Sequence, residues 1–310
     1  MTATVLVIGR KGQVATSLAE AARTADLSVT VLGRPEIDLA DPSSIHTAIA
    51  GCGADVVVNA AAYTAVDKAE SERDLTFAIN ADGVKHLAEA CAQTGRPLIH
   101  ISTDYVFDGT APGPYAEDDP VAPLGVYGAS KLAGEDFVRA ACPNHVILRT
   151  AWVVSPFGHN FVKTMLRLAE TREELGVVDD QRGSPTYAPH LADAILGIAA
   201  QVADGSGDGP WGTYNAAGTG EATWCDVARE VFEHSARLGG PSATVRPITT
   251  ADYPTPAQRP ANSRLDCSRM AATFGISLPD WRQGIEECVL RLRAEDQAGT
   301  ADAAAAGGKA

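Results

Sequence analysis

The sequence predicts an α/β fold in which helices cover both faces of a parallel sheet. Short continuous apolar runs, typical of strands buried on both faces, alternate with helical segments over the first half of the 310-residue chain. A glycine-rich turn joins the first apolar run to the first helical segment. After about residue 152 the pattern becomes mixed. We therefore expect a large sheet domain and a smaller, irregular part.

In the first half, strands and helices follow one another in turn. The predicted strands are residues 5–8, 29–32, 56–60, 98–102 and 146–150. The predicted helices are residues 14–25, 43–50, 83–94 and 127–141. This repetition predicts a parallel sheet, because each return to a parallel strand needs a crossover.

The second half is expected to form a smaller mixed part that binds the substrate. Three segments have helical patterns, residues 161–171, 191–203 and 225–236, and loops interrupt them. We expect a sheet domain from residues 1–152 with returning segments, and the substrate-binding part mainly from residues 153–295. Residues 296–310 are rich in alanine and glycine with little to bury, so we expect this tail to be disordered.

Charge and composition exclude several classes of protein. The net charge is −14 and no cluster of lysine and arginine stands out, so we expect neither nucleic-acid nor anionic-membrane binding. No apolar run of about 18 residues predicts a membrane span, and the N-terminus lacks signal-peptide features. The six cysteines form no Cys-x-x-Cys pair, and the seven histidines show no ligand spacing. We expect free thiols, a cytoplasmic protein and no metal.

The turn Gly9-Arg10-Lys11-Gly12-Gln13-Val14-Ala15 predicts a dinucleotide site. It follows the first strand and opens the first helix, which is the context that a Rossmann-type, doubly wound sheet requires. Gly9 allows the tight turn, and Gly12 lets the backbone approach a pyrophosphate at the helix N-terminus. Lys11, Gln13 and Val14 complete the predicted cofactor turn. The alternative is an ordinary glycine-rich turn.

The end of the second strand favours NADPH, with NADH possible. A site for NAD usually has a carboxylate there, for the ribose 2′-hydroxyl. Here the strand runs into Gly33-Arg34, and the first carboxylate is Glu36. Arg34 could pair with a 2′-phosphate, with Arg10 or Lys11 assisting. The alternative is that Arg34 is a solvated loop residue.

Two further segments are placed to border the adenine and the ribose. Asp38 and Leu39 follow the second strand, and Ala60, Ala61 and Ala62 end the third. Small side chains at the third strand's end would let a cofactor lie flat against the backbone. Tight packing of the loop explains these alanines equally well.

Tyr127 and Lys131 are the predicted catalytic pair. Their spacing puts both side chains on one face of a helix, about one turn apart. A fixed ammonium group lowers the pKa of a nearby phenol, which can then exchange a proton with a carbonyl or alcohol. The apolar strand at 98–102 delivers Ser102-Thr103-Asp104-Tyr105 to its carboxyl end, so the Thr103 hydroxyl could hold a carbonyl beside Tyr127. Taken alone, Tyr127 and Lys131 could be a chance pair on a helix, and the segment after the strand could be an ordinary turn.

Together these motifs resemble the extended short-chain dehydrogenases/reductases and, among them, the dTDP-4-dehydrorhamnose reductase family. The resemblance runs from Val5 to about Leu292. The glycine-rich turn and the Tyr127–Lys131 segment are shared with the whole superfamily, whereas two later segments are more specific. The segments that carry the resemblance are residues 9–14, 59–70, 102–107, 127–131, 149–152, 180–186 and 259–265.

The resemblance implies reduction of the C4 keto group of dTDP-4-dehydro-L-rhamnose by NADPH, giving dTDP-L-rhamnose. It implies that Tyr127 donates the proton, that Lys131 lowers its pKa and holds the nicotinamide ribose, and that Thr103 tunes the transfer. Ser102 is assigned to the cofactor. Two alternatives are a 4-ketoreductase of another dTDP-6-deoxysugar and a non-catalytic NADP-binding regulatory subunit.

The resemblance also assigns residues to the dTDP-sugar. Thr103, Asp104, Tyr105 and Trp152 would contact the sugar, although Trp152 could equally be a core aromatic. Arg259 and Arg264 are candidates for the diphosphate, because an anion needs fixed donors; structural arginines are the alternative. Some relatives dimerise through magnesium held by carboxylates, but the matching places here hold Ser17 and Pro189. We therefore favour a monomer, with a dimer possible.

Overall fold

A parallel sheet of six strands forms the centre of the computed structural model, which describes residues 2–203 and 209–307, with side chains to residue 297. The strand order is β2-β1-β3-β4-β5-β10, and every neighbouring pair is parallel. The strands are β1 (Thr4–Ile8), β2 (Ser28–Leu32), β3 (Val56–Asn59), β4 (Leu98–Thr103), β5 (His145–Thr150) and β10 (Gly212–Asn215). The predicted doubly wound α/β fold is confirmed.

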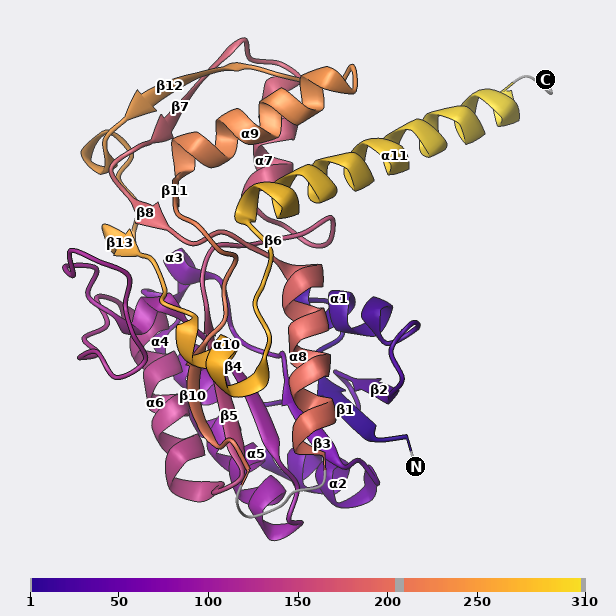
Figure 1. The fold of residues 1–310 in the computed structure, drawn as a ribbon, viewed down its shortest axis with the longest axis vertical. Helices are drawn as coiled ribbons and strands as arrows, with labels where there is room; N and C mark the ends of the chain where they lie inside the picture. The colour runs from indigo at the N-terminus through magenta and orange to yellow at the C-terminus, as the bar shows by residue number, and fades with distance from the viewer. Residues whose placement is uncertain (1, 204–208, 308–310) are drawn as a thin grey trace.

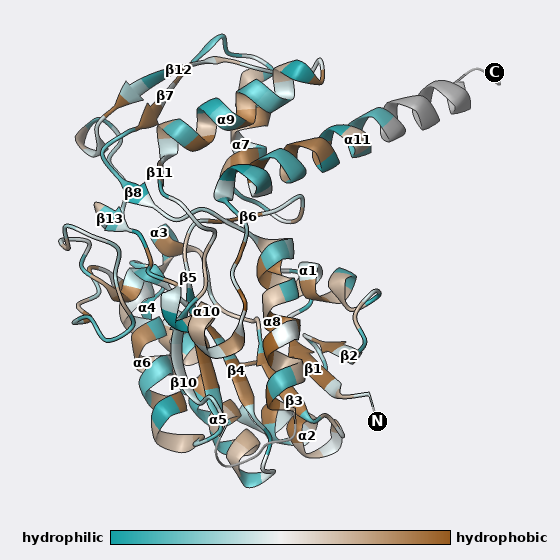
Figure 2. Cartoon of the chain, viewed as in Figure 1, coloured by the Kyte–Doolittle hydropathy of each residue, from teal (hydrophilic) through white to brown (hydrophobic). Residues whose placement is uncertain are grey.

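Each face of the sheet carries its own layer of helices, as Figure 1 shows. Alternate β1 side chains enter opposite cores: Val5 and Val7 face one layer, and Leu6 and Ile8 face the other. The first layer holds α1 (Gln13–Ala21), α8 (Ala188–Val202) and α10 (Ser268–Phe274). The second layer holds α2 (Pro42–Gly51), α5 (Gly83–Gln93) and α6 (Val126–Ala141). The apolar strands lie between these layers (Figure 2), so the sheet is buried on both faces.

The segment after residue 152 contributes to both parts of the molecule. β10, α8 and α10 return to the sheet domain. The remainder forms a smaller part with three short sheets, ordered β11-β8-β13, β12-β7 and β6-β9. Its elements are β6 (Val153–Val154), α7 (Phe161–Ala169), β7 (Glu174–Val178), β8 (Arg182–Gly183), β9 (Thr186–Tyr187), β11 (Ala222–Thr223), α9 (Trp224–Arg237), β12 (Thr244–Ile248), η3 (Thr250–Asp252), β13 (Asn262–Ser263) and α11 (Trp281–Gly307).

Short helical turns fill the connections that lead to the sheet edge. They are α3 (Val66–Ala69), α4 (Arg73–Phe77), the π-helical turn η1 (Ala78–Asp82) and the 3₁₀ turn η2 (Asp104–Val106). All six cysteines are free thiols. Among the described residues, no helix is both long and apolar enough to span a membrane.

The end of the chain, which we expect to be disordered, is helical up to Gly307 in this structure, and its disorder stays a prediction. Helix α11 continues to Gly307 and extends away from the body of the molecule (Figure 1). Alanine has the highest helix propensity of the amino acids, so an alanine-rich segment can prolong a helix without burying a side chain. Residues 308–310 lie outside the described residues.

A glycine in helix α5 offers a test of how closely the second layer packs. A Cβ atom at Gly83 would lie 2.1 Å from the backbone oxygen of Leu39. We expect Gly83→Ala to lower the free energy of unfolding by about 1–3 kcal/mol, because backbone must move to make room. Denaturant unfolding measures this. Gly51→Ala, where nothing lies within 4 Å among the described residues, is the control and should be neutral or stabilising. Equal stability of both variants would contradict the prediction.

Candidate active site

The glycine-rich turn lies where the strand order of the sheet reverses. β2 lies on one side of β1 and β3 on the other, and ligands of open α/β sheets bind at such a switch point. Gly9 has a φ of +125°, and a Cβ atom there would come within 3.1 Å of the Ala60 backbone. At Gly12 nothing among the described residues lies within 4 Å of that position, and no side chain caps α1. The turn thus offers open space and uncapped backbone N–H groups, which fit a pyrophosphate.

The neighbouring residues of the turn divide between surface and scaffold. Lys11 is exposed, and Val14 packs against the apolar core. Gln13 binds the smaller part of the molecule: its Oε1 accepts hydrogen bonds from Ser155 Oγ at 2.8 Å and Asn160 Nδ2 at 3.0 Å. The Gln13 side chain therefore holds the β6–α7 connection against the start of α1.

Arg34 places a cation just after the end of β2. It is exposed, and among the described residues it has no ion-pair partner, whereas Arg10 pairs with Glu36 at 2.9 Å. Asp38 uses Oδ1 to accept a hydrogen bond from the Ala40 backbone. Leu39 is buried against α5. Of these residues, the geometry leaves Arg34 as the one with charge to offer a 2′-phosphate.

The loop after β3 is fixed by two asparagine side chains. Asn59 Oδ1 accepts a hydrogen bond from the Ala61 backbone at 3.1 Å. Asn80, from the π-helical turn η1, accepts from the Tyr63 backbone N–H at 2.8 Å and donates to its carbonyl at 3.0 Å. Ala62 lies between these anchors and is half-buried. The loop is therefore held in place before any ligand contacts it.

Tyr127 and Thr103 come together at the carboxyl end of β4. The Thr103 hydroxyl lies close enough to lower the pKa of the Tyr127 phenol, and both residues come from elements that the sequence predicted. Gly128 makes this approach possible, because a Cβ atom there would lie 2.1 Å from the Tyr105 carbonyl oxygen. The phenol and the strand-end hydroxyl thus form one polar centre at the switch-point edge of the sheet.

The expected lowering of the Tyr127 pKa by Lys131 is not found in this structure. Burial raises the pKa of Tyr127, and the nearby Asp104 carboxyl adds to that effect while Thr103 opposes it. Lys131 Nζ instead donates to the Ile101 carbonyl at 2.8 Å and lies 3.3 Å from His100 Nε2. Burial lowers the pKa of Lys131 to about 8.

Ser102 faces the protein interior and belongs to a buried charge network. Its hydroxyl donates to Glu135 Oε1 at 2.5 Å, and Arg149 Nη2 lies 2.7 Å from Glu135 Oε2. Burial opposes the charged form of Glu135, but the Arg149 guanidinium holds the pKa of that carboxyl below its usual value. Ser102 therefore anchors β4 to α6 with its hydroxyl, and only its backbone is free to meet a cofactor.

Asp104, Tyr105 and Arg259, which the sequence predicts to contact the substrate, lie beside this centre. Asp104 Oδ1 accepts a hydrogen bond from Thr103 Oγ1 at 3.0 Å, and Oδ2 has no hydrogen-bond partner among the described residues. The Tyr105 ring meets the Tyr127 ring edge-on, 5.5 Å between centroids. Arg259 donates to the Tyr105 hydroxyl at 2.8 Å and to Asp67 Oδ2 at 2.7 Å. The C-terminal arginine is thereby joined to the β4 end.

Trp152 and Arg264 are largely engaged with the protein itself. Trp152 has a φ of +47°, stacks on Trp224 at 3.6 Å between centroids and covers Gly183. Arg264 pairs with Glu221 at 2.7 Å and also donates to an asparagine side chain and a backbone carbonyl. It lines a separate hollow of about 470 Å³. The structure brings Arg259, but not Arg264, to the Thr103 centre.

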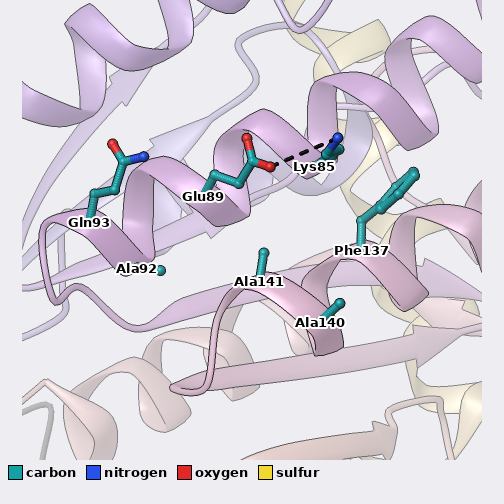
Figure 3. A pocket seen from close by; sticks show the side chains of 7 residues that line it. All are labelled: Lys85, Glu89, Ala92, Gln93, Phe137, Ala140 and Ala141. Carbon is teal, nitrogen blue, oxygen red and sulfur yellow. Dashed lines mark ion pairs between the residues drawn. The ribbon is translucent and has the colours of Figure 1, made fainter.

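Two other features lie away from this centre. The hollow in Figure 3 lies between α5 and α6, where Lys85 and Phe137 border it, and no predicted site residue lines it. Within the described chain, one group of potential metal ligands converges, His46, His86 and Glu89. His46 belongs to α2, and His86 and Glu89 belong to α5, so this group lies between two helices of the second layer.

Sequence reasoning missed the polar residues that support the centre. Asn59, His100, Glu135 and Arg149 are all buried. His100 interrupts the apolar run Leu98-Ile99-His100-Ile101, and this interruption was the available signal, since buried polar side chains need partners. The hydrogen-bond partners of these residues come from distant segments and could not be predicted from the sequence.

Comparison with known proteins identifies the family. The family model described as "RmlD substrate binding domain" matches residues 3–294. A dTDP-4-dehydrorhamnose reductase of Sinorhizobium fredii (strain NBRC 101917 / NGR234) is 49% identical over 289 residues, which cover 93% of this chain and 97% of the relative. The chain belongs to the dTDP-4-dehydrorhamnose reductase family. The predicted oxidoreductase class is confirmed at the level of this family.

Solved structures of the dTDP-4-dehydrorhamnose reductase family share the fold over almost the whole chain. The reductase from Clostridium acetobutylicum ATCC 824 has a TM-score of 0.86 at 36% identity and covers 94% of this chain and 99% of its own. The reductase from Bacillus anthracis str. Ames, solved in complex with NADP, has a TM-score of 0.86 at 34% identity and covers 94% and 100%. Neither comparison tests the individual site residues or the expected monomer, which stay predictions.

The buried Asp104 carboxyl predicts a distinctive pH dependence of stability. Burial raises its pKa to about 6 from 3.8, so the folded protein binds this proton more readily and loses stability as the pH rises from about 4 to 6. We expect the stability of Asp104→Asn relative to wild type to rise by up to about 3 kcal/mol over that range. Denaturant unfolding at several pH values measures this.

Asp108→Asn is the control for Asp104. The Thr110 backbone N–H holds the pKa of Asp108 below its usual value, so the relative stability of this variant should change in the opposite direction with pH. A relative stability of Asp104→Asn that does not vary with pH would show that Asp104 ionises normally.

Proposed function

We propose that this protein reduces the C4 keto group of dTDP-4-dehydro-L-rhamnose to give dTDP-L-rhamnose, with NADPH as cofactor and Tyr127 as proton donor. The observation that carries this proposal is the placement of Thr103, at the end of β4, beside Tyr127 of α6 at the carboxyl edge of the sheet. Family membership supports the substrate class, and the complex of the Bacillus anthracis relative supports the cofactor.

The residues around the pyrophosphate turn support NADPH as the cofactor, which supplies a hydride when bound. Gly9 and Gly12 shape the turn, and the uncapped N-terminus of α1 can bind a diphosphate. Arg34 is exposed and has no ion-pair partner among the described side chains. A 2′-phosphate would satisfy that guanidinium group.

Tyr127 is suited to the role of acid. Because burial raises its pKa, the phenol keeps its proton at neutral pH, which a proton donor requires. A carbonyl oxygen that becomes an alkoxide is far more basic than a phenolate, so transfer of the Tyr127 proton to it is downhill. The nearby Thr103 hydroxyl could hydrogen-bond to the phenol and orient it. In the ammonium form, Lys131 would stabilise the phenolate that remains.

The substrate would contact the side chains on the smaller part and on the end of β4. Thr103, Asp104 and Tyr105 face the centre, and we propose that they hold the sugar, with Trp152 bordering it. Arg259 reaches this region through Tyr105, which makes it the candidate for the diphosphate. Arg264 would act indirectly, since its contacts hold the 262–265 segment in place.

Tyr127→Phe tests the proton donor. We expect turnover of dTDP-4-dehydro-L-rhamnose to fall by about 10²-fold or more, because the hydride acceptor loses its proton source. NADPH affinity, measured by nucleotide fluorescence, should stay near that of the wild type. Tyr253→Phe, at a residue that is 61% exposed, is the matched control and should turn over normally. Near-normal turnover by Tyr127→Phe would exclude it as the acid.

The same assay separates the alternatives. NMR of the product shows its sugar and its configuration at C4, which distinguishes the rhamnose reductase from a 4-ketoreductase of another dTDP-6-deoxysugar. Stable NADP binding without any turnover of the 4-keto sugar would instead support a non-catalytic subunit.

Arg34→Ala tests the choice of nicotinamide cofactor. Removing the main charge proposed for the 2′-phosphate should raise the KM for NADPH by about tenfold and leave the KM for NADH unchanged. Steady-state kinetics with both cofactors measure the ratio. Arg172→Ala, at an exposed residue in the smaller part, is the control. Equal changes for both cofactors would contradict a role in 2′-phosphate binding.

A further inference from the structure

Lys131 ends a buried chain of three polar side chains. Its Nζ lies 3.3 Å from His100 Nε2, and His100 Nδ1 lies 3.1 Å from Asn59 Nδ2. All three residues are 2% exposed or less. The chain runs from the end of β3 through the middle of β4 to α6. It therefore connects the loop beside the cofactor turn with the lysine proposed to assist Tyr127.

Hydrogen-bond chemistry fixes the direction of this chain. The Ala61 backbone N–H can only donate, so the Asn59 atom 3.1 Å away from it must be the amide oxygen. The Asn59 NH₂ group then faces His100 Nδ1, which must accept and so carries no proton. A neutral imidazole has its proton on the other nitrogen, Nε2, and this proton points toward Lys131.

The protonated Nε2 distinguishes the two forms of Lys131. A neutral amine has a lone pair that can accept this hydrogen bond, whereas an ammonium group has donors alone. With the ammonium form, two donors would face each other at 3.3 Å in a buried place. The bond from Nζ to the Ile101 carbonyl is available to both forms. The arrangement therefore favours the amine.

We propose that His100 is a positioning residue whose proton-bearing nitrogen, set by Asn59, decides how readily Lys131 takes up its proton. To accept from an ammonium group, His100 would have to carry its proton on Nδ1, and the Asn59 amide would have to turn. That turn would place the Asn59 NH₂ group against the Ala61 N–H, which leaves a buried donor unpaired. The importance of Lys131 for turnover rests on the proposed function, but its titration does not.

The variants tested below leave the neighbouring ionisable residues around the Asn59–His100–Lys131 chain unchanged. Among the described residues, the other ionisable groups that act on this network are Glu135 on Lys131, His145 on His100, and Arg149 through Glu135. Glu135 favours the charged form of Lys131, and burial opposes it. Because none of these groups is altered, a change in the Lys131 titration reports on Asn59 and His100.

Asn59→Asp is the direct test. The carboxylate has the shape of the amide, keeps an oxygen for Ala61 N–H and offers a second oxygen that accepts a proton from His100 Nδ1. Nε2 then loses its proton and can accept from the Lys131 ammonium. We expect the titration midpoint of Lys131 to rise by about one pH unit or more. NMR of the full chain with ¹³C-labelled lysine measures it, because the sequence has six lysines and Lys131→Met identifies the signal.

His100→Gln separates transmission through the imidazole from the effect of the new charge. A glutamine can turn its amide oxygen toward Lys131 whatever Asn59 does, so this variant alone should also raise the midpoint. In the His100→Gln background, Asn59→Asp should raise the Lys131 midpoint little further, since glutamine has no imidazole whose proton Asn59 could place. An unchanged midpoint in His100→Gln, or an undiminished shift in the double variant, would overturn the proposal.

Kinetics connect the titration to the proposed reaction. If the ammonium form of Lys131 assists Tyr127, the basic limb of the pH profile of kcat/KM should move upward with the NMR midpoint in both variants. A shifted midpoint with an unshifted basic limb would support the role of His100 and count against the role of Lys131 in catalysis. An unshifted Lys131 midpoint in an active enzyme would overturn the role of His100 and leave the proposed function standing.

Discussion

The site depends on how closely helix α6 packs against the end of strand β4. Gly128 allows this approach, since a Cβ atom there would lie 2.1 Å from the backbone oxygen of Tyr105, and Gly134 allows α6 to approach η1, where a Cβ atom would lie 2.2 Å from the backbone oxygen of Asn80. Glu135 then joins α6 to β4 through Ser102, and to β5 through Arg149. A buried ion pair is costly to desolvate, and in this molecule it is satisfied by several donors. It determines which residues of α6 face the Thr103 hydroxyl.

The two parts of the molecule meet across the same edge of the sheet. Arg259 connects Asp67 and Tyr105 from the C-terminal side, and Gln13 ties the β6–α7 connection to the cofactor turn. Both contacts use residues beside the proposed reactants. The positions of the smaller part and of the glycine-rich turn are thus coupled by direct hydrogen bonds, which would favour one relative placement of the two proposed ligands.

The sequence predicted the strands that are continuously apolar and the motifs at their ends. It did not reveal β10, because Gly-Thr-Tyr-Asn is short and mostly polar, and only its pairing with β5 makes it a strand. Thr103, Tyr127 and Lys131 could be found from spacing. Their supports could not, because the partners of His100, and the Arg149 that pairs with Glu135, lie 14 to 41 residues away in the chain. Spacing is local, whereas hydrogen-bond partners depend on the packed fold.

The Tyr127–Lys131 pair shows why helical spacing alone did not give the electrostatics. An i, i+4 pair on an exposed helix would interact through water, and a cation would then favour the phenolate. In the folded protein Lys131 is buried and Tyr127 is half-buried, and removal from water acts on the two in opposite directions: it raises the pKa of the phenol and lowers that of the amine. Both shifts favour the neutral pair. An acid that must hold its proton until an alkoxide forms benefits from this, and so the ammonium needs a separate control, which His100 is placed to supply.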